Sequence, residues 1–114
     1  MEIRRGNYKI FKFQRTSKAT GQVITDTPEK MYFTVKDNAY KKDFLFQKTL
    51  KNGITYDQET NYYQIEILQN DTENLAFGTY EYDIKIINDK DKPKTLKVGT
   101  LEITDVVTHK VNEV

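Results

Sequence analysis

The chain has 114 residues, with 18 Lys and Arg against 17 Asp and Glu, a formal net charge of +1, and neither Cys nor Trp. This length fits one domain with a single hydrophobic core. The absence of Cys excludes a disulfide scaffold, a thiolate zinc site and a cysteine nucleophile. The near-zero net charge argues against nucleic acid or an anionic membrane as partner, and the aromatic share of 12% argues against disorder.

The N-terminal residues Met1–Gly6 lack the apolar stretch of a secretory signal, and no window approaches the 18 apolar residues of a membrane-spanning helix. We therefore expect synthesis and folding in a cytosol, where reducing conditions suit a chain without Cys.

The first β-strand is expected over Tyr8–Arg15, where the apolar phase changes between Ile10 and Phe11 and so predicts a β-bulge. Strict alternation of apolar and polar residues predicts further strands with one buried face. The expected inward residues, in chain order, are Met31, Phe33 and Val35; Phe44 and Phe46; Ile54 and Tyr56; Tyr63, Ile65 and Ile67; and Tyr80, Tyr82, Ile84 and Ile86.

The last strand is expected over Lys94–Thr104, with a change of phase at Gly99 that predicts a bulge or bend. Tight turns are expected at Thr20-Gly21 and Asn52-Gly53. Asn88–Pro93 should form a hairpin loop, and Asn70–Phe77 should contain one helical turn.

About seven to eight short strands at this spacing predict an all-β fold, an antiparallel β-sandwich with a barrel as the alternative. We expect a single domain over residues 1–108 and a loose tail over 109–114.

No arrangement of residues indicates catalysis, so we predict that the chain is not an enzyme and binds no cofactor or metal. His109 lies in the tail, and Ser17 lies in a polar turn, so neither suits a nucleophile–base pair. Glu81 and Asp83 should face solvent, and lysines flank the aspartates of Asp89–Asp91, which argues against a calcium site.

Charge is distributed unevenly along the chain. Residues 1–15 carry five Lys and Arg against one Glu, whereas residues 57–85 carry seven acids against one Lys. This predicts a basic edge and an acidic face, suited to head-to-tail contacts between copies or to docking on a partner, with an unevenly charged solvated surface as the alternative. Tyrosines outside the core phase are also candidates for contact. The candidate partner surface comprises Arg4, Arg5, Lys9, Lys12, Tyr32, Tyr40 and Tyr62.

The segment Asp71–Ile84 carries the pattern D-T-x-x-L-x-x-G-x-Y-x-Y-D-I, in which a polar cap and an inward leucine precede a tyrosine corner. Three further segments match in chain order: Arg5–Asn7, Met31–Lys36 and Gly99–Thr104. The last of them is followed by Val107–His109, which matches the closing V-T-H. Together they resemble small immunoglobulin-like proteins encoded by tailed phages and prophages, mostly of Firmicutes. A more distant likeness is to the N-terminal domain of phage upper baseplate proteins.

The resemblance implies an immunoglobulin-like β-sandwich and a structural role in the virion, at the tail or baseplate. It also implies synthesis in the bacterial host cytoplasm followed by incorporation into the particle. The expected partners are other virion proteins or further copies of the chain. The alternative is a host-directed module that binds carbohydrate or inhibits a host protein.

Overall fold

The computed structural model describes residues 1–38, 40–88 and 92–105. The sequence expectations for Asp89–Asp91, for His109 and for the tail over 109–114 lie outside these residues. The described part of the chain contains eight strands and one short helix, joined by turns and loops. They are β1 (Glu2–Arg4), β2 (Lys9–Gln14), β3 (Lys30–Lys36), β4 (Phe46–Leu50), β5 (Gly53–Asp57), β6 (Tyr62–Ile67), α1 (Gln69–Thr72), β7 (Gly78–Asn88) and β8 (Lys92–Thr104).

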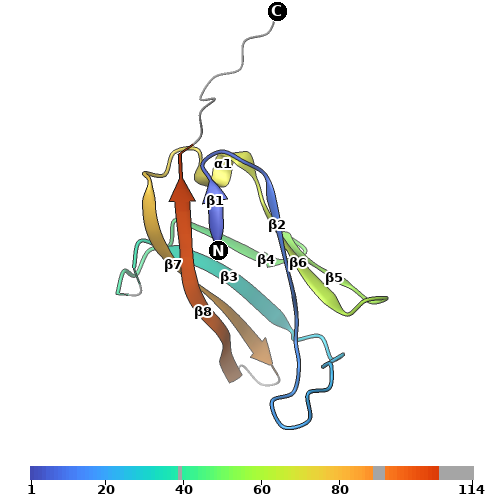
Figure 1. The fold of residues 1–114 in the computed structure, drawn as a ribbon. Coiled ribbons are helices and arrows are strands. Elements are labelled where there is room, and N and C mark those ends of the chain that lie inside the picture. The colour runs from blue at the N-terminus through green and yellow to red at the C-terminus, as the bar shows by residue number, and fades with distance from the viewer. Residues whose placement is uncertain (39, 89–91, 106–114) are drawn as a thin grey trace, which may run out of the picture.

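All eight strands belong to one curled, barrel-like sheet in the order β1-β8-β7-β3-β4-β5-β6-β2 (Figure 1). The predicted all-β class is confirmed. The expected antiparallel pairing holds for five of the seven strand pairs, whereas β1 pairs with β8 and β4 pairs with β5 in parallel. Strands β1 and β2 are the two ends of the sheet, so each has a neighbour on one side only.

The step from β4 to β5 is made by a very short turn at the predicted Asn52-Gly53 site. Gly53 has a φ of 100° and Lys51 a φ of 67°, so both occupy the left-handed region. Instead of reversing the chain as a hairpin would, this turn places Gly53 beside Thr49 in parallel register. The sheet therefore continues from one half of the molecule into the other without a break.

The core follows the predicted alternation on β3, β6 and β7. The inward residues of these strands are all buried: Met31, Phe33, Val35, Tyr63, Ile65, Ile67, Tyr80, Tyr82, Ile84 and Ile86. Ile54 is also fully buried, and Tyr56 packs against the core. Phe44 differs, because it precedes β4 and is 50% exposed, whereas Phe46 is buried as expected.

The bulge predicted between Ile10 and Phe11 is absent. Strand β2 keeps one continuous register with β6, from the Lys9–Ile67 pair to the Gln14–Tyr62 pair. Phe11 therefore faces inward and Ile10 faces outward, where it is 41% exposed.

The phase change on β8 occurs three residues earlier than predicted. The register with β7 shifts after the Ile84–Lys97 pair, and Leu96 is the residue left without a partner. Gly99 lies inside the regular ladder, opposite Tyr82. A Cβ at Gly99 would lie 2.7 Å from Cζ of Tyr82, so the glycine is explained by the ring that covers it.

Two smaller differences concern strand ends. Strand β1, which we did not predict, runs parallel to β8 with Ile3 buried beside Ile103 (Figure 1). The ladder of β7 and β8 extends to the Asn88–Lys92 pair, so Pro93 belongs to β8 and not to the hairpin loop.

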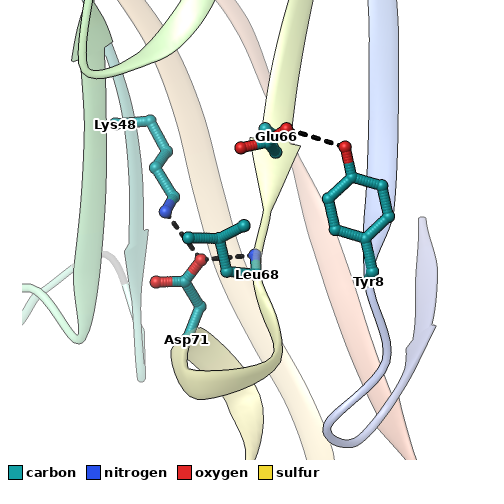
Figure 2. A network of polar contacts seen from close by, with 5 residues as sticks. All are labelled: Tyr8, Lys48, Glu66, Leu68 and Asp71. Carbon is teal, nitrogen blue, oxygen red and sulfur yellow. Dashed lines mark hydrogen bonds and ion pairs between the residues drawn. The ribbon is translucent and has the colours of Figure 1, made fainter.

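The crossing from β6 to β7 contains the predicted helical turn, as α1. Asp71 does not occupy the cap position. Its Oδ2 reaches back to accept the backbone N–H of Leu68 at 2.7 Å, and the same oxygen lies 2.6 Å from Lys48 Nζ on β4 (Figure 2). Thr72 is fully buried, and its Oγ1 accepts the N–H of Gly6 at 2.8 Å.

Two further residues complete the crossing. Gly78 has a φ of 147°, which permits the re-entry into β7 expected at this position. The Tyr80 hydroxyl donates to the carbonyl of Ala76 at 2.6 Å, which confirms the predicted tyrosine corner.

Candidate interaction surface

The basic residues predicted at the N-terminus mostly bind the protein's own backbone. Arg4 Nη1 donates to the carbonyl of Asp105 at 2.9 Å, and Lys9 Nζ donates to the carbonyl of Glu2 at 2.8 Å. These contacts hold the short strand β1 against β8 and β2.

Arg5 is similarly occupied. Its guanidinium carbon lies 4.1 Å from the centre of the Phe77 ring, and Nη1 donates to the carbonyl of Leu75 at 3.4 Å. Arg5 therefore anchors the β1–β2 connection to the β6–β7 crossing.

The remaining four candidates lie on separate surfaces. Lys12 and Tyr62 share the outer face of β2 and β6, because Lys12 pairs with Gln64, and both Gln64 and Tyr62 alternate with buried residues of β6. Tyr32 lies on the outer face of β3, and Tyr40 lies in the following loop at 97% exposure. The structure therefore does not gather the seven predicted residues into one surface.

The predicted division into a basic edge and one acidic face is also not observed. Basic β2 is an edge strand, but it pairs with acidic β6, and the Tyr8 hydroxyl donates to Glu66 Oε2 at 2.7 Å (Figure 2). That hydrogen bond raises the pKa of Tyr8. The backbone N–H of Glu59 lowers the pKa of Asp57, with a small contribution from Lys12.

The acidic residues of 57–85 are divided between two parts of the sheet. Glu66 lies on β6, while Glu81 and Asp83 lie on β7, as predicted on positions that alternate with buried residues. The acidic side chains thus lie on strands next to basic ones, with β6 beside β2 and β7 beside β8.

A larger feature lies where the curled sheet fails to close. Among the described residues, β2 pairs only with β6, and residues 92–99 of β8 pair only with β7. Between them lies a cavity of about 540 Å³, which we call the seam groove. Its lining residues are Phe13, Gln14, Arg15, Thr16, Ser17, Lys18, Ile24, Ile84, Lys94, Thr95, Leu96 and Lys97.

The seam groove is strongly basic. Of the twelve described residues that line it, four are Lys or Arg and none is Asp or Glu. Lys97 is in register with buried Ile84, and Lys94 with buried Ile86, so both lysines occupy the inward phase of β8. Lys97 Nζ lies 5.3 Å from the centre of the Phe11 ring on β2, across the seam.

Arg15 is one of the residues that line the seam groove. Its Nη1 donates to the carbonyl of Asp26 at 2.9 Å, but its buried Nε has no hydrogen-bond partner among the described residues. The buried hydroxyl of Tyr63 also lacks a partner of suitable geometry, although Arg15 lies close enough to influence it. Burial raises the pKa of Tyr63, and the neighbouring guanidinium opposes that rise.

The sequence did not identify the seam groove, although it contained one signal. Lysines at positions 94 and 97 stand where a buried strand would carry apolar residues, on the phase that faces Ile84 and Ile86. The inward orientation of these lysines follows only from the register between β8 and β7, which the bulge at Leu96 shifts.

The described residues hold no cluster of three or more His, Asp or Glu side chains that could bind a metal ion. Ser17, the one serine, accepts the N–H of Thr20 within the turn of residues 17–22, where Gly21 has the expected positive φ. In the part of the chain that the structure describes, no helix is long and apolar enough to cross a membrane.

No protein-family model matches the sequence, and no curated protein matches it.

Proposed function

We propose that this chain is a non-enzymatic module that acts through protein–protein contacts, as a structural or assembly protein of a phage or prophage virion, at the tail or baseplate. The observation that carries the proposal is that the segments on which the resemblance to the phage proteins rests make buried contacts that hold the fold together. Asp71 and Thr72 of the D-T pattern bind Lys48 and Gly6, and Gly6 belongs to the R-G-N segment.

The strand order supports an immunoglobulin-like sandwich as the finer description of the fold. Division of the sheet between β4 and β5 gives one group ordered β1-β8-β7-β3-β4 and another ordered β5-β6-β2. Apart from the short strand β1, these groups resemble the GFCC′ and DEB layers of a variable-type immunoglobulin domain. The rings of Phe11 and Tyr82, one from each group, meet edge to face at 6.4 Å.

The tyrosine corner supports the same description. In immunoglobulin domains, the corner tyrosine stands near the start of strand F and its hydroxyl binds backbone a few residues upstream. Tyr80 occupies that place on β7 and binds Ala76. Tyr82 then stands where the disulfide-forming cysteine of an antibody domain would lie.

Free strand edges suit assembly. In the part of the chain that the structure describes, β2 and residues 92–99 of β8 have no second neighbouring strand, so their outer edges could pair with a strand from a virion protein or from a second copy.

Mass spectrometry of purified virions from an induced lysogen that encodes the chain tests the proposal. We expect the chain to co-purify with infectious particles through a density gradient, and its deletion to reduce the yield of particles with complete tails. A chain absent from virions, with particles unaffected by the deletion, would contradict the proposal. Glycan-array binding in that case would favour the host-directed alternative.

A further inference from the structure

We propose that the seam groove binds an extended, acidic segment of a partner protein, which adds to the free edge of β8 in line with β1. This inference rests on the proposed function, because it names the chemistry of the contact through which the module would act. Three independent features of the described residues lead to it.

The first feature is the arrangement of the backbone. Strand β1 pairs with β8 only over Glu102–Thr104, and the N–H of Glu102 donates to the carbonyl of Met1 at 2.8 Å. Below that point, the same edge of β8 continues to Lys92 without a pairing strand among the described residues. A segment placed there would continue the parallel ladder that β1 begins (Figure 1).

The second feature is the mixture of surfaces in the seam groove. Phe13, Ile84 and Leu96 contribute apolar area to its lining. Because side chains of an extended strand alternate between its two faces, one face of an added segment would contact these residues and the other would face solvent.

The third feature is charge. Arg15, Lys18, Lys94 and Lys97 all line one cavity, and no Asp or Glu is among its described lining residues. Glutamate or aspartate in the segment would therefore find complementary charge, whereas a basic segment would be repelled.

Inward-pointing lysines on an edge strand have a competing explanation, since such charges also block pairing between sheet edges. The two explanations differ in outcome. A purely protective role for Lys94 and Lys97 predicts that no segment binds, whereas the proposed site predicts selective binding of an acidic one.

Fluorescence anisotropy with labelled peptides of about ten residues, a typical strand length or slightly more, separates these outcomes. The probe alternates Thr and Glu. The matched peptides alternate Thr and Lys, or carry Pro at two central positions of the Thr-Glu sequence. We expect binding of the Thr-Glu peptide alone, weakened by added salt.

The variant Lys94→Glu/Lys97→Glu should weaken that binding by about tenfold or more. The matched control is Lys42→Glu/Lys85→Glu, which reverses two exposed lysines beside Phe44 on the outer face of the sheet and should leave affinity unchanged. Circular dichroism checks that both variants fold. Hydrogen exchange should show amide protection over residues 94–99 when the Thr-Glu peptide is bound.

Absence of binding, equal binding of the Thr-Lys peptide, or equal weakening by both double variants would overturn the inference. The result is separable from the virion test. A chain that is found in particles but ignores the acidic peptide retains the proposed function and loses this site.

Discussion

Lys48 Nζ on β4 lies 2.6 Å from Oδ2 of Asp71 on α1, and both side chains are nearly buried, at 11% and 14% exposure. The same carboxylate oxygen accepts the N–H of Leu68 at 2.7 Å. One acidic side chain thus joins the crossing helix to a strand from a distant part of the sequence. This relationship explains a lysine on the inward phase of β4.

Replacement of Asp71 by Ala should destabilise the fold, because it leaves the Lys48 ammonium without its partner in a nearly buried position. We expect the free energy of unfolding to fall by about 3 kcal/mol. Urea denaturation measures this value. The exposed variant Asp26→Ala is the matched control and should change it by less than about 0.5 kcal/mol.

A double-mutant cycle isolates the ion pair. Lys48→Met retains the length of the side chain and removes the charge, so its effect in the Asp71→Ala background should be much smaller than in the parent. Strictly additive effects would show that the two residues do not interact.

The Tyr80 hydroxyl should contribute measurably to stability, whereas the Tyr63 hydroxyl should not. Tyr80→Phe removes the hydrogen bond that the hydroxyl donates to the carbonyl of Ala76. The free energy of unfolding should fall by about 1 kcal/mol. Tyr63→Phe removes a buried hydroxyl that has no partner, so stability should stay constant or rise slightly. Thermal and urea unfolding of the two variants compare them directly, and an equal loss in both would refute the assignment.

Stability should fall in alkaline solution through the same two tyrosines. Burial raises the pKa of both Tyr63 and Tyr80 above the ordinary value of 10.0, and it is the largest cause of the rise in each case. A raised pKa in the folded state gives stability that is complete below the unfolded pKa and is lost as pH rises through the folded pKa. The free energy of unfolding should therefore be lower above about pH 10 than at pH 9. This decrease should be smaller in Tyr63→Phe than in the parent protein. An identical decrease in parent and variant would contradict this expectation.

Gly99 should not accept a side chain. A Cβ there would lie 2.7 Å from Cζ and from the hydroxyl oxygen of Tyr82, so Gly99→Ala must displace a core ring. We expect a loss of about 1–3 kcal/mol in the free energy of unfolding. Val98→Ala, at the adjacent exposed position, should cost little. A Gly99→Ala variant as stable as the parent would show that the ring moves freely.

The sequence by itself determined the strands that alternate strictly. On β3, β6 and β7 the apolar residues recur at every second position, and a one-residue shift would expose all of them, so the buried faces are fixed by pattern alone. The tyrosine corner followed for a related reason, since Gly78, Tyr80 and the turn before them are close in sequence.

Only the tertiary structure decided features that depend on pairing. Strand β1 exists because β8, about a hundred residues away in sequence, offers it an edge, and the bulge at Leu96 is defined by the register with β7. The seam groove brings Arg15 and Lys18 together with Lys94 and Lys97. Local periodicity carries no information about such distant neighbours, because the order of strands in the sheet sets their separation.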